Sequence, residues 1–412
     1  MQQFTGWQYL LIDAANQFGH DKLVYEERLK WAEENLDNLE DLARGKDWKE
    51  KPQYLKACMA IRKAQRGEPS GHLVGFDAIC SGMQIMSVLT GCIDGARATG
   101  LIDPDRRADA YTECSAIMSE ILGFTVENQR SKIKTAVMTS LYGSRKEPEN
   151  LFGEDTDELA AFKQAMFKLA PGAVELLSIL LESWDPETYA HTWQLPDGFD
   201  SVIKVMQTVE KRIEVDELYH SSFIFQYEEN LPAPKGVSNA ANVVHSVDAY
   251  VLRQMIRRCS MDRDLVRFMR DLMTAELLDR HLNGWNQPAV LGENHQRLML
   301  MVEAEMPDPL AFELMDAYSA RSVPTPLLKK LVNLADSMLD HPAFPMMAVH
   351  DEFKCHPNNL NHLRKHYNNT LADLAESETL SFILRRLMKT TGTVTKLGDI
   401  AGYIRNANYA LS

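Results

Sequence analysis

The chain has 412 residues, with 44 Lys and Arg against 58 Asp and Glu, which gives a formal net charge of −14 at pH 7. Its 45% of hydrophobic and 25% of charged residues are typical of a globular protein with a large core. No stretch approaches the roughly 18 apolar residues of a transmembrane helix, so we expect no membrane contact. At first, the acidic total also argues against a protein that coats nucleic acid, because phosphate binding needs a positive surface.

The beginning of the chain and its cysteines both indicate a protein of the cytosol. No basic segment precedes the first apolar residues, and Asp13 comes early, so no signal peptide is expected. The cysteines form no CxxC pair and are expected to be free thiols. They are Cys58, Cys80, Cys92, Cys114, Cys259 and Cys355.

Helices are predicted through most of the first half of the chain. Apolar residues from Leu29 to Ala43 recur every three or four positions, which indicates a helix that ends at Gly45. The predicted elements that follow are a helix at 54–66, a buried strand at 72–76, and helices at 107–122, 126–142 and 155–184, the last divided at Pro171-Gly172.

The second half mixes strands with helices. The segments 201–206 and 221–227 have the period of strands and are joined by an acidic segment, so they predict one hairpin. A helix from about Ser238, a Met- and Leu-rich helical block at 262–340 and an apolar strand at 346–349 follow. The chain is therefore predicted to be α+β and mostly helical.

Two aspartates are candidate metal ligands. Asp77 follows the first strand, and Asp351 follows the strand at 346–349. Carboxylates at two neighbouring strand ends can hold a pair of divalent ions, and Mg²⁺ prefers oxygen ligands when substrate phosphates complete its shell. Each aspartate alone is also explained as an ordinary turn or N-cap residue.

A basic helix face is the second candidate feature. Arg130, Lys134 and Met138 are spaced i, i+4 and i+8, so they share one face, and Tyr142 with Gly143 stands at the helix end. Two cations one turn apart would clamp a triphosphate, and the tyrosine would face a sugar or a base. On spacing alone, a solvated basic face is the better interpretation.

Two histidine-containing segments are less specific. His245 lies on the helix that begins near Ser238, where a lone histidine is usually a core residue. The segment His20-Asp21-Lys22 precedes the first long helix and is also explained as a solvated turn.

Together and in order, these segments resemble one protein family. GFDAICSGMQ (75–84), RxxxKxxxMTxxYG (130–143) and VHDEF (349–353) are similar to motifs A, B and C of the single-subunit RNA polymerases of bacteriophages and mitochondria. The resemblance extends from about residue 7 to the C-terminal tail. Three further stretches fit the same family, namely HDKLVYEERLKWAEENLDNL (20–39), LPDGF (195–199) and NVVHSVD (242–248).

The resemblance implies a DNA-directed RNA polymerase that joins NTPs to an RNA 3′ end along a DNA template. Asp77 and Asp351 would bind two Mg²⁺ ions, with the Ala78 carbonyl as a further ligand. One ion would lower the pKa of the RNA 3′-hydroxyl, and the other would neutralise the triphosphate as pyrophosphate leaves.

The resemblance also implies roles in substrate binding. Arg130 and Lys134 would bind the phosphates of the incoming NTP, and Lys134 would protonate the leaving pyrophosphate. Lys22 would reach the outer phosphates, and Tyr142, supported by His245, would read the ribose 2′-OH. The other implied substrate-site residues are Ser81, Gly82 and Gln84 at the pocket floor and against the nucleic-acid strands, Gly143 beside the tyrosine, and His350 at the primer end.

In fold, the resemblance implies the palm and fingers of a right-hand polymerase, with the thumb and N-terminal domain absent from this chain. A second subunit would supply these parts, as in the two-subunit RNA polymerase of N-four-like phages, whose larger subunit this chain resembles. We therefore expect a heterodimer in the cytoplasm of an infected bacterial host, aided by a single-stranded-DNA-binding or recruiting factor. The expected parts are 1–68 (palm-associated helices), 69–100 (palm with motif A), 101–258 (fingers with motif B and a hairpin at 201–229), 259–340 (a helical insertion and docking surface) and 341–412 (palm with motif C and the tail).

Two features depart from the family pattern. The connection from His245 to Asp351 is longer than in the family, which marks 259–340 as an insertion. The tail 408–412 only loosely resembles the family's aromatic-Ala-aromatic-Ala ending, so its role at the active site stays open.

Two other functions stay open as alternatives. The tripeptide His350-Asp351-Glu352 looks like motif C of family-A DNA polymerases, although Ser81 stands where that family has a Glu that blocks a 2′-OH. A catalytically idle adaptor derived from a polymerase is the other alternative.

The net charge is compatible with a polymerase because the cations are grouped along the sequence. A polymerase needs positive charge only along its cleft, so −14 predicts that this chain alone binds DNA weakly and depends on a partner. The groups are Arg62, Lys63 and Arg66; Arg130, Lys132, Lys134, Arg145 and Lys146; and Arg253, Arg257 and Arg258.

Overall fold

A computed structural model of the protein describes residues 1–126, 129–285 and 292–412. Parts of the predicted helix at 126–142 and of the predicted block at 262–340 lie outside the described residues. Helices predominate, so the expectation of a mostly helical α+β chain is confirmed. The helices are α1 (Gly6–Ala15), α2 (Tyr25–Glu34), α3 (Leu39–Leu42), α4 (Lys51–Gln65), α5 (Ser81–Thr90), α6 (Ile93–Ala98), α7 (Ala110–Leu122), α8 (Arg130–Leu141), α9 (Lys146–Phe152), α10 (Asp157–Leu169), α11 (Pro171–Glu182), α12 (Ser238–Ser260), α13 (Arg263–Asn283), α14 (Glu293–Glu303), α15 (Ala311–Leu314), α16 (Thr325–Leu339), α17 (Leu360–Glu376), α18 (Thr379–Leu387) and α19 (Ala401–Asn406).

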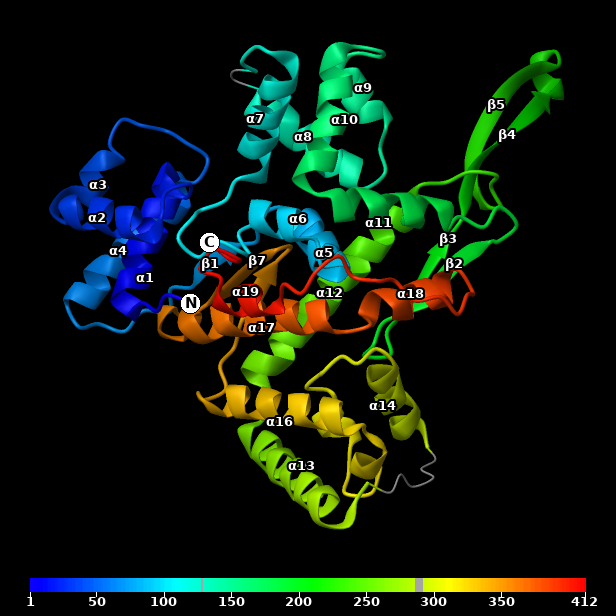
Figure 1. The fold of residues 1–412 in the computed structure, drawn as a ribbon. Coiled ribbons are helices and arrows are strands. Elements are labelled where there is room, and N and C mark those ends of the chain that lie inside the picture. The colour runs from blue at the N-terminus through cyan, green and yellow to red at the C-terminus, as the bar shows by residue number, and fades with distance from the viewer. Residues whose placement is uncertain (127–128, 286–291) are drawn as a thin grey trace.

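A small antiparallel sheet in the order β1-β7-β6 lies at the centre of the molecule (Figure 1). Its strands are β1 (Val74–Asp77), β6 (Met347–Val349) and β7 (Glu352–Cys355). Buried Phe76 lies opposite buried Phe353, and Asp77 lies opposite Glu352. Burial of the apolar partners thus fixes a register that brings together segments some 275 residues apart.

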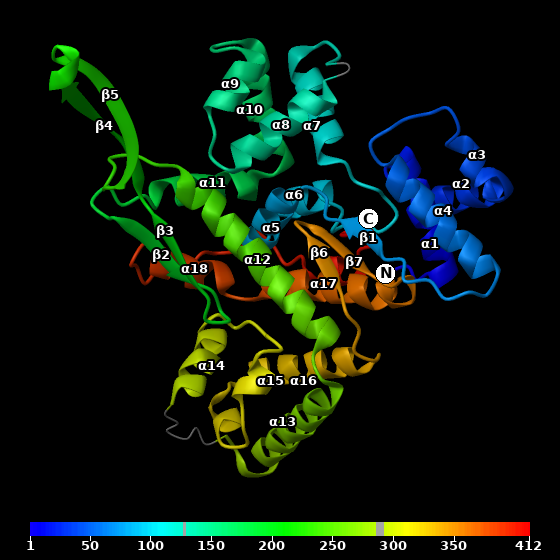
Figure 2. The ribbon, with the colours of Figure 1, turned by 180° about the vertical axis from the view of Figure 1, so that it is seen from behind.

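The elements around this sheet extend in four directions (Figures 1 and 2). Helices α1–α4 lie on one side and α7–α10 stand above, while the four helices from α13 to α16 lie below. The long helix α12 crosses the back of the molecule, and a hairpin of β4 and β5 projects away from the body. Nearly every residue of α5 is buried, because this helix packs against α11, α12 and α17.

The hydrophobic residues form two separate cores. The larger core surrounds the sheet and takes in residues from Tyr9 to Leu411. A second core, rich in Met and Leu, lies among α13–α16 and includes Val266, Leu328 and Met338. Helices α13 and α16 therefore bury their apolar faces mainly against each other.

The two ends of the chain meet beside the sheet. The fully buried guanidinium of Arg364 donates to the Asn408 carbonyl (2.7 Å), the Tyr9 hydroxyl (2.9 Å) and the Gln2 carbonyl (3.1 Å). The Tyr25 and Tyr409 rings stack with centroids 4.8 Å apart. Because a buried charge must be hydrogen-bonded to be stable, these contacts hold the C-terminal tail against the body.

The predicted single hairpin is wrong in its pairing. Two hairpins form instead, one from β2 (Ala190–Gln194) and β3 (Asp200–Lys204), the other from β4 (Met206–Val215) and β5 (Ser221–Asn230). The partner of β5 is the acidic segment itself. Its charged residues alternate with Val209 and Ile213, so the segment has the period of a strand although it is polar.

Other elements differ in their bounds. The predicted helix through Ala43 breaks after α2, where Asn35 ends the helix and donates to the Trp31 carbonyl from both its backbone amide (3.2 Å) and its side chain (2.8 Å). Strand β7 and helices α9, α17 and α18 were not expected from the pattern. Pro171 does divide the helix at 155–184, since α10 and α11 meet at a bend of 106°.

All six cysteines are free, as expected. In the described ranges, no single helix is long and apolar enough to cross a membrane, although α10 and α11 together pass the same test of length and composition.

Candidate active site

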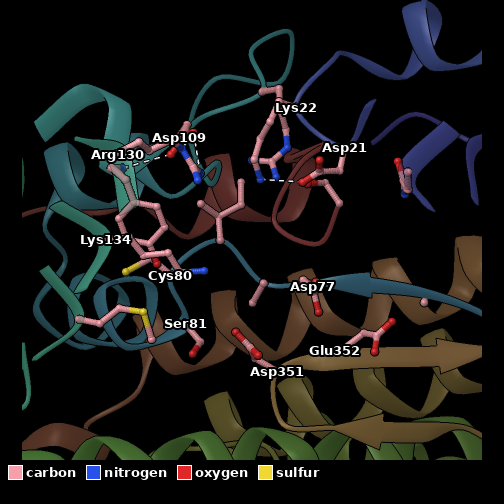
Figure 3. Close-up of a pocket in the computed structure, with 18 of the residues that line it drawn as sticks. Asp21, Lys22, Asp77, Cys80, Ser81, Asp109, Arg130, Lys134, Asp351 and Glu352 are labelled. Atoms are coloured by element: carbon pink, nitrogen blue, oxygen red, sulfur yellow. Dashed lines mark hydrogen bonds and ion pairs between the residues drawn. The ribbon is translucent and has the colours of Figure 1, made fainter. Parts of the chain in front are cut away.

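One cleft gathers most of the residues that the sequence singles out. It has a volume of about 590 Å³ and opens above the end of β1 (Figure 3). Seven separate segments of the chain line it. The sequence-predicted residues in its lining are Lys22, Asp77, Ala78, Ser81, Gly82, Arg130, Lys134, Tyr142 and Asp351.

Asp77 and Asp351 lie at the floor of this cleft (Figure 3). Asp77 is the last residue of β1, and Asp351 lies in the tight turn between β6 and β7, where His350 takes a left-handed φ of 56°. The Ala78 amide donates to the Asp351 carbonyl (3.1 Å), which fixes the turn beside the strand end. The two candidate metal ligands are thus brought together by strand pairing.

The floor carries an excess of negative charge. The cleft displaces water from Asp77 and, together with the charges of Glu352 and Asp351, raises the pKa of Asp77 to about 6. Burial and the charge of Asp351 also raise the pKa of Asp248, on α12, to about 6. Lys354, which lies 2.7 Å from Glu352, offsets only part of this charge. A group of oxygen donors that repel one another fits a site for divalent cations such as Mg²⁺.

The wall formed by α8 is basic. The Arg130 guanidinium lies 2.9 Å from the carboxylate of Asp109, the residue that caps the N-terminus of α7. Burial raises the pKa of Asp109, but Arg130 and the cap hydrogen bonds outweigh burial and leave that pKa below its usual value. The Lys134 ammonium lies 5.6 Å from the centre of the Tyr111 ring and faces the cleft.

A second cationic wall faces α8 across the cleft (Figure 3). Here Lys22 follows a π-helical turn at Asn16–His20, and its ammonium lies 2.6 Å from the Asp21 carboxylate. The two walls therefore place positive groups on both sides of an acidic floor.

Tyr142 stands at the C-terminal end of α8, where Gly143 takes a φ of 88° and ends the helix. The Tyr142 ring contacts the His245 ring, with centroids 4.7 Å apart. A Cβ atom on Gly82 would lie only 3.2 Å from the Tyr142 hydroxyl, so the absence of a side chain on Gly82 leaves space for this hydroxyl. Burial, followed by the charges of Cys80, Asp248 and Asp351, raises the pKa of Tyr142 to about 12.

Four residues implied by the resemblance do not line the cleft. Gln84 is fully buried, and its amide bonds the Thr99 and Ala410 carbonyls and the Tyr367 hydroxyl, so it supports the core and the tail. Gly143 packs near Leu181 and Val237 behind α8. His245 and His350 are exposed at the cleft's edge, beside Tyr142 and Asp351 respectively.

Several lining residues were missed in the sequence. Asp21, Arg107, Asp109, Tyr111, Glu352 and Ser412 all border the cleft. Asp109 had a visible signal, because an aspartate before a helix is a typical N-cap. The tail residue Ser412 had none; its amide donates to the Asp77 carbonyl (3.0 Å), while Leu411 bridges to Ala78.

Comparison with known proteins finds similarity to RNA polymerases over the first part of the chain. Residues 3–150 match the family described as DNA-dependent RNA polymerase. A probable DNA-directed RNA polymerase of Neurospora crassa is 31% identical over 158 residues, which cover 34% of this chain and 18% of that protein. The mitochondrial DNA-directed RNA polymerase 1 of Arabidopsis thaliana is 30% identical over 172 residues, with the same coverage.

The matched part is therefore a small share of the relatives, and the chain spans less than a fifth of their length. The family match includes Lys22, Asp77, Arg130, Lys134 and Tyr142 but ends before Asp351. Only the fold links the matched segment to that second aspartate.

Proposed function

We propose that this chain carries the catalytic site of a DNA-directed RNA polymerase, which transfers nucleotides from NTPs to an RNA 3′-hydroxyl on a DNA template. One observation carries the proposal: Asp351, outside the family match, lies beside Asp77 at the floor of the cleft, below the basic wall of α8. A carboxylate floor under cationic walls is what two-metal nucleotidyl transfer requires.

In this proposal the protein works mainly by positioning charge. Asp77 and Asp351 would hold two Mg²⁺ ions, with Ala78 contributing its carbonyl. When bound, these ions would lower the pKa of the RNA 3′-hydroxyl and neutralise the triphosphate. The carboxylates crowd one another, which supports this role because cations would relieve their repulsion.

The walls would bind the triphosphate. Arg130 would exchange its bond to Asp109 for the phosphates of the NTP, and Lys22 would exchange Asp21 for the outer phosphates. The Lys134 ammonium would give a proton to the pyrophosphate as the bond between the α-phosphorus and the bridging oxygen breaks. Sequence would be read by base pairing with the template, so the protein need only fix the geometry.

The remaining sequence-based roles complete the proposal. Tyr142, packed on His245, would read the ribose 2′-hydroxyl above Gly82. Ser81 would shape the floor, and His350 would contact the primer end. The sheet with α5 and α17 would form the palm, α7–α12 the fingers, and 259–340 an inserted docking unit. Contacts of Gln84 or Gly143 with substrate are not part of the proposal, because both lie outside the cleft.

We further propose that a second polymerase subunit, and a single-stranded-DNA-binding or recruiting factor, act with this chain in a phage-infected bacterial cell. The net charge of −14 supports a dependence on partners. Tight binding of DNA by the purified single chain at physiological salt would contradict it.

The direct test is Asp351→Asn in the polymerase purified with its accompanying chains. We expect RNA synthesis on a primed template to fall by about two orders of magnitude or more, since a metal ligand is lost. Asp94→Asn, at an exposed aspartate on α6 outside the cleft, should retain full synthesis and serves as the matched control. Unchanged synthesis in Asp351→Asn would place catalysis elsewhere and favour an idle adaptor.

A second measurement separates the RNA polymerase from a DNA polymerase. Wild-type protein should extend primers with rNTPs in preference to dNTPs, because Ser81 leaves room for a 2′-hydroxyl. A preference for dNTPs would overturn the proposed function.

A further inference from the structure

Arg107 is a cation of the cleft that the sequence motifs do not include. It lies in the segment between α6 and α7, three residues before α7 begins, and it lines the same cleft as Asp77 and Lys134. Its side chain is largely buried. Among the residues that the structure describes, the Nε atom is inaccessible to water and has no hydrogen-bond partner, and one terminal nitrogen bonds only to the neighbouring Ala108 carbonyl.

A second buried cation, Arg28, lies near Arg107, and its guanidinium is not paired with a carboxylate of the described residues. Arg28 is fully buried, and its guanidinium donates only to neutral oxygens, those of Leu23, Asn16 and Asp21, each at 2.9 Å. These acceptors are two backbone carbonyls and an amide, so no carboxylate of the described part of the chain hydrogen-bonds to Arg28. Burial lowers the pKa of both Arg28 and Arg107, and the charge of Arg107 lowers the pKa of Arg28 further.

Two carboxylates face Arg107, and both already pair with other cations. The Asp21 carboxylate lies 2.6 Å from the Lys22 ammonium, and the Asp109 carboxylate lies 2.9 Å from the Arg130 guanidinium. The two acids that act on Arg107 are thus each already paired with another cation. Buried positive charge in excess of its partners is costly unless an anion joins it.

We propose that Arg107 and Lys22 form a phosphate subsite opposite Arg130 and Lys134, which binds the outer phosphates of the incoming nucleotide and the pyrophosphate formed from them. Arg28 is a positioning residue, which braces the Lys22 loop through the Asp21 carbonyl. A guanidinium with free N–H groups suits this task, because its fork binds two phosphate oxygens at once. This inference rests on the proposed polymerase function.

The test compares Arg107→Gln with Arg107→Lys and with Arg106→Gln as matched control. Arg106 is the preceding residue, is exposed, and pairs with Glu113 rather than with any group in the cleft. Single-nucleotide extension by the purified polymerase gives KM for ATP, and inhibition by inorganic tripolyphosphate gives its Ki. We expect both constants to rise by about tenfold or more in Arg107→Gln and less in Arg107→Lys, while Arg106→Gln equals wild type.

The outcomes separate this inference from the function on which it rests. Equal KM and Ki in wild type and Arg107→Gln, both active, would overturn the subsite alone. If wild type makes no RNA, the proposed function fails, and calorimetric titration of the chain with tripolyphosphate still tests the subsite through its loss in Arg107→Gln. Should Arg107→Gln not fold, as judged by its melting curve, Arg107→Lys must raise the Ki, or the inference is wrong.

Discussion

Tyr142 presents its hydroxyl to the cleft from the end of α8. The ring is fixed on one side by His245, and Gly82 leaves the space into which the hydroxyl points. Because its pKa is raised to about 12, the group stays protonated and able to donate a hydrogen bond at any physiological pH. This combination suits a group that distinguishes a sugar hydroxyl from a hydrogen.

We therefore expect Tyr142→Phe to admit dNTPs. Loss of one hydrogen bond should lower the ratio of kcat/KM for rNTPs over dNTPs by about tenfold, with little change in fold because the ring remains. Primer extension with each nucleotide type measures the ratio. Tyr189→Phe, an exposed tyrosine outside the cleft, is the control; an unaltered ratio in Tyr142→Phe would remove the residue from this role.

At the scale of elements, the hairpin of β4 and β5 stands apart from the rest of the protein (Figure 1). Strand register places Val209 and Ile213 on the same face as Phe223, Phe225 and Tyr227, whereas the opposite face carries Glu210, Glu214 and Glu228. The three aromatic side chains are each more than a third exposed. The hairpin thus has an apolar face that the body of the chain does not cover.

This arrangement predicts that the hairpin is dispensable for the fold. Replacing residues 208–228 by Asn-Gly joins Gln207 to Glu229, which are already paired, through a favourable two-residue turn. The melting temperature should change by no more than about 2 °C, because no large buried surface is lost. Extension of a preformed primer should also persist. A large fall in melting temperature would show that the hairpin packs on the body in solution.

At the scale of the whole molecule, a histidine cluster lies where the two hydrophobic cores meet. His341, just after α16, shares a 2.7 Å hydrogen bond between Nε2 atoms with His366 on α17, and His362 stacks nearby. Burial, followed by the nearby charges of His362 and Arg263, lowers the pKa of His341 to about 4, although the Pro342 carbonyl opposes the change. Burial and Arg258 lower the pKa of His366 well below its usual value.

Acid should therefore destabilise the folded protein through this histidine cluster. A histidine whose pKa is lower in the folded state binds fewer protons there than when unfolded, so its stabilising effect is lost as pH falls from about 6.5 towards 4. The slope is about 1.4 kcal/mol per pH unit for each such histidine. Asp77 and Asp248, with raised pKa values, act in the opposite sense, so only a difference between variants isolates the histidines.

His341→Gln should show a shallower loss of unfolding free energy between pH 6.5 and 4 than the wild type. Urea unfolding at several pH values measures this slope. The control is His220→Gln, at the exposed hairpin tip, which should keep the wild-type slope. Identical slopes in His341→Gln and wild type would mean that His341 does not govern acid sensitivity.

The charge distribution is also a property of the whole molecule. Of the cation groups noted in the sequence, only Arg130 and Lys134 line the cleft. Three of the other cations form ion pairs within the chain: Arg253 with Asp197 (2.6 Å), Arg258 with Asp373 (2.7 Å) and Arg62 with Glu40 (2.7 Å). These charges therefore stabilise the fold and do not contribute to the cleft. The basic character of the cleft is therefore local, which supports the prediction that the single chain binds DNA weakly.

The sequence by itself determined the helical character, because hydrophobic period is a local property, and its motifs named nine of the 25 residues that line the cleft. The family resemblance, and not the spacing alone, predicted that Asp77, Arg130, Lys134 and Tyr142 share one site. The sequence did not determine which strands pair, since β4 is polar and β7 is short. Pairing depends on partners far along the chain.

Only the tertiary structure decided the rest. The pairing of β1 with β7 places Asp351 beside Asp77. The tail residue Ser412 hydrogen-bonds to the end of β1. Arg107 lines the cleft although it lies in a segment that carries no motif. Gln84, which the resemblance places against the substrate, is instead buried in the core, where its side chain forms three hydrogen bonds. In each case the deciding quantity is burial, which depends on segments distant in sequence and is invisible in any local pattern.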